Sequence, residues 1–305
     1  MPRIARIKDE NAIYHIMIRS ISEVNLFRDD EDKIAYINIV NEYKKLYLFK
    51  VYGYCIMTNH AHFIIDCCGA DISKIMHSIN FKYARYFNNK HKRHGHLFQD
   101  RFKSKIVKDE RYLCALSLYI HNNPTDIKKY KNSPQKYRFS SLYIYLGSKK
   151  DEFNLVDDKF ILSIFSKNLR KARNKYKNIV CTCIGKAIND IDIIDEITEY
   201  RSQRYIIKRG YSVDNIIEFI CKSFNVSKNS MYLKNVKDMV YIKSMLVVFM
   251  RSICGMKCSD ICKVLGNITQ SRVSKLSSIG INLIMSDEKY DLIFQKFIKE
   301  DLKVS

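Results

Sequence analysis

The stretch LFKVYGYCIMTNHAHFIID, residues 48–66, decides the fold expected for this chain. It contains two runs of apolar and aromatic residues, 48–57 and 61–66, separated by a short polar break at Thr58-Asn59, which His60 follows. A break that short favours two neighbouring antiparallel strands joined by a tight turn. The centre of the fold is therefore expected to be a β-hairpin.

The segments on either side of this hairpin predict one further strand and several helices. Residues 12–19 alternate apolar and polar side chains, which is typical of a strand. One helix is expected from about residue 30 and a long amphipathic helix from Asp71. A third runs from residue 109 to about residue 123, where Pro124 stops it, because the residue before a proline is pushed away from helical angles.

The charge balance indicates what kind of partner the chain has. Its 305 residues include 53 Lys and Arg but only 32 Asp and Glu, giving a formal net charge of +21. A surplus of this size repels itself and finds a favourable partner in a polyanion, of which nucleic acid is the first candidate. The composition, 47% hydrophobic and 12% aromatic, is that of a globular protein and excludes wholesale disorder.

Several other classes of protein are not expected. The most apolar stretch, residues 245–250, is far shorter than the roughly 18 to 20 residues of a membrane-spanning helix. Asp9 and Glu10 stand where a secretory signal would have its apolar core, so the protein is expected to be cytoplasmic. The ten cysteines are then expected to be reduced, and their close groups lack the paired spacing of zinc sites.

Residues 82–108 form a strongly basic window, with nine Lys and Arg against the single acid Asp100. We expect phosphate contacts here, although a merely solvated charged face is the alternative. The side chains that we expect to contact DNA are Lys82, Arg85, Arg101, Lys103 and Lys105.

The segment His60-Ala61-His62 carries the first chemical signal. Residues two apart on a strand face the same way, so both imidazoles would project from one face and could bind a divalent cation together. Two ordinary histidines on a polar face are the alternative, and this short pattern alone does not separate the two interpretations.

Tyr119 and Asn123 are four residues apart on a predicted helix and hence on the same helical face. A tyrosine hydroxyl can attack phosphorus, but its ordinary pKa near 10 makes it a poor nucleophile at neutral pH. A cation that withdraws charge from the phosphate would ease the attack. Asn123 could supply an oxygen ligand beside the two histidines, and this donor set suits Mg²⁺ or Mn²⁺. A half-buried tyrosine of the core is the alternative for Tyr119.

Four segments in this order resemble the REP-associated tyrosine transposases, which are single-tyrosine members of the HUH family. They are YCIMTNHAHFII (54–65), LFQDRFKS (97–104), YIHNNP (119–124) and YRFSS (137–141). The resemblance covers about residues 1–147. One departure is visible: Phe139 stands where relatives usually have tryptophan, which changes packing and casts no doubt on catalysis.

This resemblance implies a fold and a reaction. The implied fold is α+β, a ferredoxin-like antiparallel sheet with the histidines on a central strand and the tyrosine on a nearby helix. The strands and helices expected above from the sequence pattern agree with this fold independently. His60 and His62 would hold the metal, Asn123 would be its third ligand, and Tyr119 would be the nucleophile. Tyr119 would attack single-stranded or hairpin DNA of a repetitive palindromic element, forming a 5′-phosphotyrosine and releasing a 3′-OH. A second 3′-OH could reverse the step without ATP, and the acting species would be a monomer or a homodimer.

The carboxy-terminal part is expected to be helical, and residues 213–283 resemble, more faintly, the DNA-binding domain of the replication initiator DnaA. A helix over 258–265, a turn at Gly266 and a second helix from Thr269 would form a helix-turn-helix whose second helix enters the major groove of duplex DNA. A helical bundle that mediates oligomerisation is the alternative. In the helix-turn-helix interpretation, the exposed residues at the start of the second helix would include Gln270, Ser271, Arg272 and Lys275.

The chain is therefore expected to have three parts: a HUH transposase domain over 1–150, a helical linker region over 151–205 and a DnaA-like domain over 206–305. Single helices are expected at 159–177 and 184–200 within the linker region. Two other functions remain open. One is a nicking protein of the replication-initiator type, and the other is a non-catalytic regulator that binds promoters and uses its amino-terminal half to dimerise.

Overall fold

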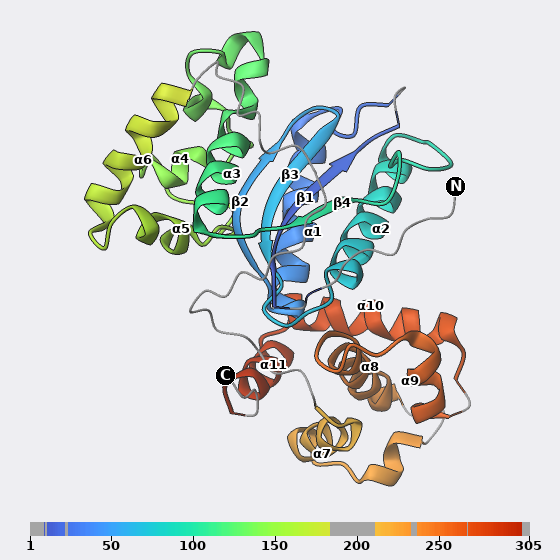
Figure 1. Cartoon of the computed structure of the whole chain (residues 1–305). Helices are drawn as coiled ribbons and strands as arrows, with labels where there is room; N and C mark the ends of the chain where they lie inside the picture. The colour runs from blue at the N-terminus through green and yellow to red at the C-terminus, as the bar shows by residue number, and fades with distance from the viewer. Residues whose placement is uncertain are drawn as a thin grey trace. The chain divides into compact units, whose positions relative to one another are not determined.

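A computed structural model describes residues 9, 11–21, 24–183, 211–232, 237–266 and 268–300. The chain divides into a first unit, residues 1–68 and 72–204, and a second unit, residues 69–71 and 205–305. Each unit is described by itself below (Figure 1). None of the described helices combines the length and the apolar character needed to cross a membrane.

A four-stranded antiparallel sheet forms the centre of the first unit. Its strands are β1 (Ile13–Arg19), β2 (Lys50–Ile56), β3 (His60–Asp66) and β4 (Lys103–Ile106), in the spatial order β2-β3-β1-β4. The hairpin of β2 and β3 is the one expected from residues 48–66, and β1 pairs with the other edge of β3. This order, with one helix between β1 and β2 and one between β3 and β4, is the ferredoxin-like arrangement. The α+β class is confirmed.

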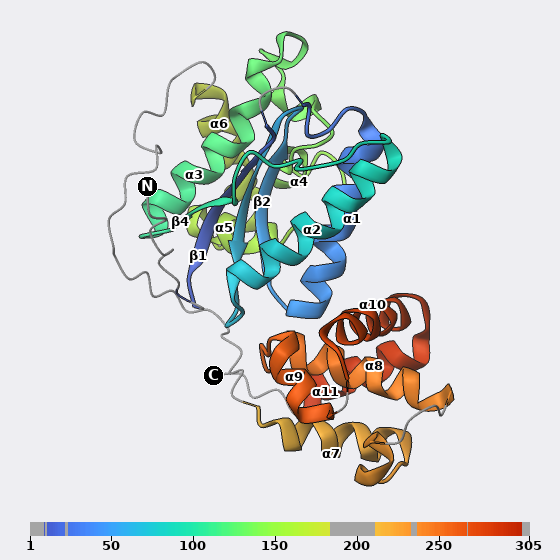
Figure 2. The same cartoon turned by 90° about the vertical axis from the view of Figure 1, so that its right-hand side faces the viewer.

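Helices α1 (Asp30–Tyr47) and α2 (Ile72–Lys90) cover one face of the sheet, as Figure 2 shows. The Asp29 side chain caps α1 by accepting a hydrogen bond from the Asp32 amide. Between helices and sheet lies an aromatic core in which the Tyr36 ring packs against Tyr83 at 4.9 Å and against Phe63 at 5.8 Å between centroids. This face is therefore filled by core side chains.

The opposite face is covered by α3 (Glu110–Asn122), with α4 (Leu142–Tyr145), α5 (Asp158–Phe165) and α6 (Leu169–Cys183) beside it (Figures 1 and 2). Three short 3-10 turns, Asn123–Asp126, Lys128–Tyr130 and Pro134–Lys136, connect α3 to α4.

The single helix expected over 159–177 is wrong, because the chain breaks between α5 and α6. Ser166 adopts an extended backbone, and its hydroxyl accepts a hydrogen bond from the Asn168 amide. The Asn168 side chain then accepts from the Lys171 amide, so it caps the start of a new helix. Local capping by these two polar residues outweighs the apolar periodicity that runs through them.

The described part of the region 151–205 packs on the first unit. The Phe160 ring of α5 stacks on Tyr52 of β2 at 4.7 Å, and Tyr176 of α6 is fully buried beside His121 of α3. The helix expected at 184–200 lies outside the described residues.

The second unit is helical, as expected. Its helices are α7 (Val213–Phe224), α8 (Lys237–Ser252), α9 (Cys258–Leu265), α10 (Gln270–Ser286) and α11 (Glu288–Glu300), with a 3-10 turn at Lys228–Tyr232. The Phe249 ring lies at its core and contacts Phe219, Phe294 and Phe297 at 5.0 to 5.9 Å. Thr269 caps α10 through its hydroxyl, and α9 and α10 lie where the two helices of the predicted helix-turn-helix are expected.

Candidate active site

The two histidines of β3 project from the sheet face that α3 covers. In the register of the antiparallel pair, His60 lies opposite Arg19 and His62 opposite Met17. Their rings are 5.2 Å apart between centroids and almost perpendicular. His62 is buried and His60 is half-buried. The alternation of side chains along β3 thus brings both imidazoles to one place, because residues two apart share a face.

Helix α3 brings Tyr119 and Asn123 to the same place. The half-buried Tyr119 ring lies 5.6 Å from the His62 ring, edge to face. The Asn123 side chain donates a hydrogen bond to the Tyr119 carbonyl at 2.9 Å and lies close enough to His60 to influence its pKa. Two imidazoles, an amide and a phenol, which come from segments about 60 residues apart, therefore meet over β3.

The electrostatic environment keeps the imidazoles neutral. Burial lowers the pKa of His62 well below its ordinary value, with His15 and His60 acting in the same direction. Burial also lowers the pKa of His60, where the nearby Asn123 amide opposes the effect and Arg19 adds to it. A neutral imidazole keeps a lone pair for a metal ion. Two such nitrogens and the Asn123 amide oxygen are chemically suited to Mg²⁺ or Mn²⁺, so these residues fit a divalent cation.

Two residues that the sequence did not single out contact the histidines directly. His15 of β1 is 4% exposed, and its Nε2 lies 3.0 Å from Nδ1 of His62. Asn59 places its Oδ1 2.7 Å from Nδ1 of His60. Asn59 adjoins the histidine pair in sequence, and this adjacency was a usable signal. His15 had none, because its contact depends on the pairing of β1 with β3.

His121, next but one to Tyr119, belongs to a buried network and not to the site. Its two ring nitrogens lie 2.7 Å from the Tyr176 hydroxyl and 2.7 Å from the Ser141 hydroxyl. The Ser141 hydroxyl also accepts a hydrogen bond from the Tyr54 amide at 2.9 Å. This network ties α3 to β2 and α6. It gives Ser141, in the segment 137–141, a structural role. Since both nitrogens of His121 are engaged, this ring is unsuited to take the proton of Tyr119.

These buried imidazoles predict that the chain loses stability on mild acidification. Burial lowers the pKa of His121 to about 3, and burial with the Lys105 charge lowers that of His15 to about 4. Below their ordinary value of about 6.5, the unfolded chain binds protons that the folded chain does not. The free energy of unfolding therefore falls as the pH drops, by about 1.4 kcal/mol per pH unit for each group.

Urea unfolding between pH 6.5 and 5 measures this slope. In a His121→Gln variant one group no longer titrates, so the average slope over this interval is expected to be smaller by about 1.1 kcal/mol per pH unit, approaching about 1.4 at its acid end. A free energy of unfolding that stays constant over this interval would contradict the prediction.

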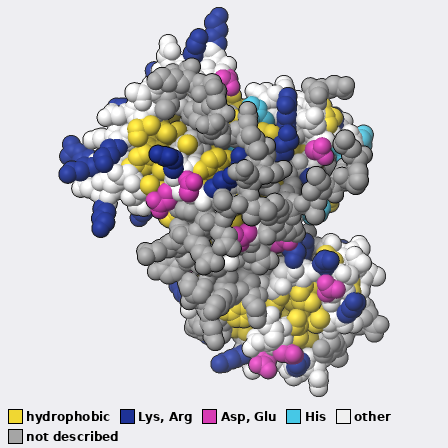
Figure 3. All heavy atoms as spheres, in the orientation of Figure 1, with side chains coloured by type: hydrophobic (Ala, Val, Ile, Leu, Met, Phe, Trp, Pro, Cys, Tyr) yellow, Lys and Arg dark blue, Asp and Glu magenta, His cyan; other side chains and the backbone are white. Residues whose placement is uncertain are grey.

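The basic window splits between the two faces of the sheet. Lys103 and Lys105 of β4 pair with Met17 and His15 and therefore share the face of the histidines. Arg101 is exposed just before β4. Lys82, by contrast, lies on α2 against the other face and forms an ion pair with Glu42 at 2.6 Å, and Arg85 of the same helix lies over the Phe81 ring. Figure 3 shows Lys and Arg side chains on both units.

The residues expected to contact duplex DNA all lie in the first two turns of α10. These are Gln270, Ser271, Arg272 and Lys275, and each is exposed. Lys243 of α8 lies near Arg272, and burial together with the Arg272 charge lowers the pKa of this lysine.

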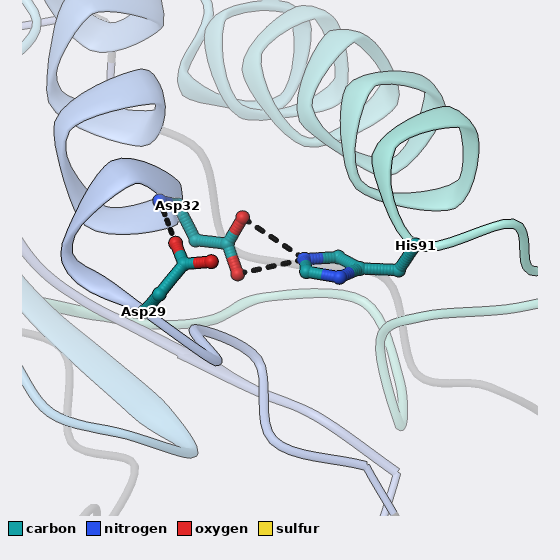
Figure 4. A group of neighbouring side chains, drawn as sticks. All are labelled: Asp29, Asp32 and His91. Atoms are coloured by element: carbon teal, nitrogen blue, oxygen red, sulfur yellow. Dashed lines mark hydrogen bonds and ion pairs between the residues drawn. The ribbon is translucent and has the colours of Figure 1, made fainter.

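Asp29, Asp32 and His91 form a second cluster of possible metal ligands among the described residues (Figure 4). Its charges are already matched. The Lys90 ammonium lies 2.8 Å from Asp29 and 3.1 Å from Asp32, and the His91 ring contacts Asp32 at 2.9 Å. The cluster joins the start of α1 to the end of α2, so it has a structural explanation that needs no metal.

Comparison with known proteins finds one family that resembles the part of the chain carrying the site. Residues 8–123 match the family described as "Transposase IS200 like". This part of the chain is similar to the IS200-like transposases. The matched segment contains β1 to β4 and reaches as far as Asn123, so it includes the histidine pair and Tyr119. The resemblance to transposases drawn from the motifs is confirmed at this level, whereas the likeness of the second unit to DnaA stays a prediction.

One solved structure is also similar: "Structure of the REP associates tyrosine transposase bound to a REP hairpin". The similarity covers 52% of this chain and 93% of that chain, with 14% identity and a TM-score of 0.43. Among curated protein sequences, no match to this chain is found.

Proposed function

We propose that the first unit is a metal-dependent single-tyrosine transposase that cleaves and rejoins single-stranded or hairpin DNA. The observation that supports this most is the convergence of Tyr119 with His60, His62 and Asn123 inside a segment similar to the IS200-like transposases. A phenol beside two neutral imidazoles and an amide is suited to phosphoryl transfer.

In the proposed reaction, the Tyr119 hydroxyl oxygen attacks the phosphorus of a phosphodiester in the DNA. A bond forms between that oxygen and phosphorus, and the bond from phosphorus to the 3′-oxygen breaks. The tyrosine proton goes to solvent and the leaving 3′-oxygen takes up a proton, so the products are a 5′-phosphotyrosine and a free 3′-OH. One ester replaces another, and a second 3′-OH can therefore reverse the step and rejoin strands without ATP.

Three side chains would hold the cation: the ring nitrogens of His60 and His62 and the amide oxygen of Asn123. A divalent ion bound there, Mg²⁺ or Mn²⁺, would neutralise charge on the phosphate under attack. Asn123 would have a second task, because its hydrogen bond to the Tyr119 carbonyl fixes the end of α3 relative to the histidines. The hydrogen bond between His121 and Ser141 would hold the same helix, α3, in place.

Incubation of the protein with labelled single-stranded hairpin DNA tests the proposal. With Mg²⁺ or Mn²⁺ we expect a covalent band that survives a denaturing gel, and with a chelator we expect none. A chain that binds the hairpin but forms no adduct under either condition would favour the non-catalytic regulator. A cleaved site at an origin instead of beside a repeated palindrome would favour a replication-type nicking protein.

The lysines of β4 are proposed to contact the DNA backbone, because they share the face of the histidines. Replacing Lys103 by Ala is expected to weaken binding of single-stranded DNA and to reduce its salt slope by about 0.7. Lys82→Ala is the matched control, since this lysine is engaged by Glu42 on the other face of the sheet. Fluorescence anisotropy over a range of salt concentrations measures both variants, and equal slopes for Lys103→Ala and the unmodified protein would remove this lysine from the DNA path.

The second unit is proposed to bind duplex DNA through the first turns of α10. The exposed side chains of Gln270, Ser271 and Arg272 stand at the amino-terminal end of a helix that follows a turn, as in a recognition helix. Arg272→Ala is expected to weaken duplex binding by roughly tenfold, which is about 1.4 kcal/mol and within the range of a base contact. A gel-shift titration with genomic duplex fragments measures it, and unchanged affinity would favour a bundle that only mediates oligomerisation.

A further inference from the structure

Both histidines of the proposed metal site have the same ring nitrogen engaged by a neighbour. Nδ1 of His62 lies 3.0 Å from Nε2 of His15, and Nδ1 of His60 lies 2.7 Å from Oδ1 of Asn59. The two partners come from different places, β1 and the turn between β2 and β3, and differ in chemistry. The same nitrogen is nevertheless engaged in both rings.

We propose that His15 and Asn59 are positioning residues that fix His60 and His62 in the tautomer whose Nε2 binds the divalent cation. This inference rests on the proposed function, because it assigns a role at the same site. The neutral imidazole has one nitrogen that carries a proton and one that carries the lone pair. A partner that only accepts at Nδ1 therefore reserves the lone pair of Nε2 for the cation.

The chemistry at His60 leaves one assignment. The Asn59 Oδ1 is a carbonyl oxygen and only accepts, so the hydrogen bond requires a proton on Nδ1 of His60. At His62 the same arrangement requires His15 to accept through its Nε2 and to carry its own proton on Nδ1. In both His60 and His62, Nε2 then carries the lone pair and is available to the cation.

His15 is placed so that water cannot replace it. His15 is 4% exposed and His62 3% exposed, and their rings are stacked at 5.2 Å between centroids. Around His15 lie Tyr119 of α3, edge to face at 6.3 Å, and Lys105, its register partner on β4. Asn59 is exposed, so solvent can take over as acceptor for His60 when its amide is removed. The two residues should therefore differ in how much their loss matters.

Titration of the full chain with Mn²⁺, followed by electron paramagnetic resonance of the free ion, tests this without any reaction. His15→Leu keeps bulk but removes the acceptor, and we expect its affinity for Mn²⁺ to fall by about 10- to 100-fold. His15→Gln can place an amide oxygen near the position of Nε2, and we expect it to recover most of the affinity. Asn59→Ala is expected to lose less than His15→Leu.

The tautomers give a second and independent measurement. Long-range proton–nitrogen spectra of the histidine-labelled chain should show Nδ1 protonated in His15, His60 and His62. A proton on Nε2 of His62 would overturn the inference, as would an unaltered affinity of His15→Leu for Mn²⁺. Equal losses in His15→Leu and His15→Gln would also overturn it, because restoring the acceptor would then have no effect.

The outcome can be separated from that of the proposed function. If the unmodified protein forms the covalent adduct while His15→Leu binds Mn²⁺ normally, the transposase stands and the positioning role fails. If the tautomers and affinities are as expected but no adduct forms, the positioning role stands and the transposase proposal fails.

Discussion

In the Tyr119→Phe variant the covalent adduct between protein and hairpin DNA should vanish, a loss on the order of 10³-fold or more. The change removes one oxygen atom and leaves the ring that packs against His62 and His15. Binding of the cation and of the DNA should therefore survive while the attack on phosphorus does not. A denaturing gel measures the adduct, and anisotropy with the same hairpin measures binding.

Tyr112→Phe is the matched control for this variant. Tyr112 lies seven residues before Tyr119 on α3 and hence on the same helical side, and burial with the neighbouring Tyr119 raises its pKa to about 12. Among the described residues its hydroxyl has no hydrogen-bond partner, so its removal leaves no polar group unsatisfied. The adduct should form as in the unmodified protein. An adduct retained by Tyr119→Phe and lost by Tyr112→Phe would identify Tyr112, about two helical turns earlier, as the nucleophile.

The same pair of variants separates the catalytic proposal from the regulator. A protein that merely binds DNA would show no adduct in any variant and the same affinity in all of them. A transposase would show unchanged binding but a loss of adduct confined to Tyr119→Phe. The distinction rests on a single hydroxyl group, because the two tyrosines share a helix, a residue type and partial burial.

The hairpin at the centre of the sheet was predictable because its signals are local. The two apolar runs and the polar break of residues 48–66 specify β2, the turn and β3 without reference to the rest of the chain. Strand β4 was not predicted, since its sequence KSKI lacks an apolar alternation. It forms by pairing with β1 at the edge of the sheet, and this depends on residues about 90 positions earlier.

The site shows the same division between local and distant information. Residues two apart on a strand, or four apart on a helix, share a face. This rule was enough to predict that His60 lies beside His62 and Tyr119 beside Asn123. The contact between His15 and His62 joins residues 47 positions apart and follows from the register of β1 against β3, which no pattern in the sequence states. Proximity in sequence also did not reveal that Lys82 and Lys103, which belong to one basic window, lie on opposite faces of the sheet.

Gly280→Ala is expected to destabilise the second unit severely, although alanine is ordinarily favoured over glycine inside a helix by about 1 kcal/mol. A Cβ atom built on Gly280 of α10 would lie 2.4 Å from the Ser244 carbonyl oxygen of α8 and 2.7 Å from Cγ2 of Val248. The first of these atoms belongs to helix backbone, so no side-chain rotation can relieve the contact. The helices must separate, and the expected loss is about 3 kcal/mol or more in the free energy of unfolding.

The control for this variant is Ser278→Ala, two residues earlier on the exposed side of α10. Among the described residues its hydroxyl bonds only to the Ser274 carbonyl within the helix, so this change should leave the stability within about 0.5 kcal/mol. Thermal and urea unfolding of the full chain, followed by circular dichroism, compare the two. A Gly280→Ala variant as stable as the unmodified protein would mean that α8 and α10 do not cross this closely.

The crossing at Gly280 also bears on the proposed binding of duplex DNA. Arg272 and Lys275 are presented by the same helix that Gly280 seats against α8, and the Arg251 side chain bonds to the Ser277 hydroxyl at 2.7 Å across this interface. Loosening the crossing should therefore weaken duplex binding even though Gly280 is buried, and should leave formation of the covalent adduct intact if the first unit acts alone in that step. Measuring both activities in one variant shows whether the two proposed DNA contacts can be separated.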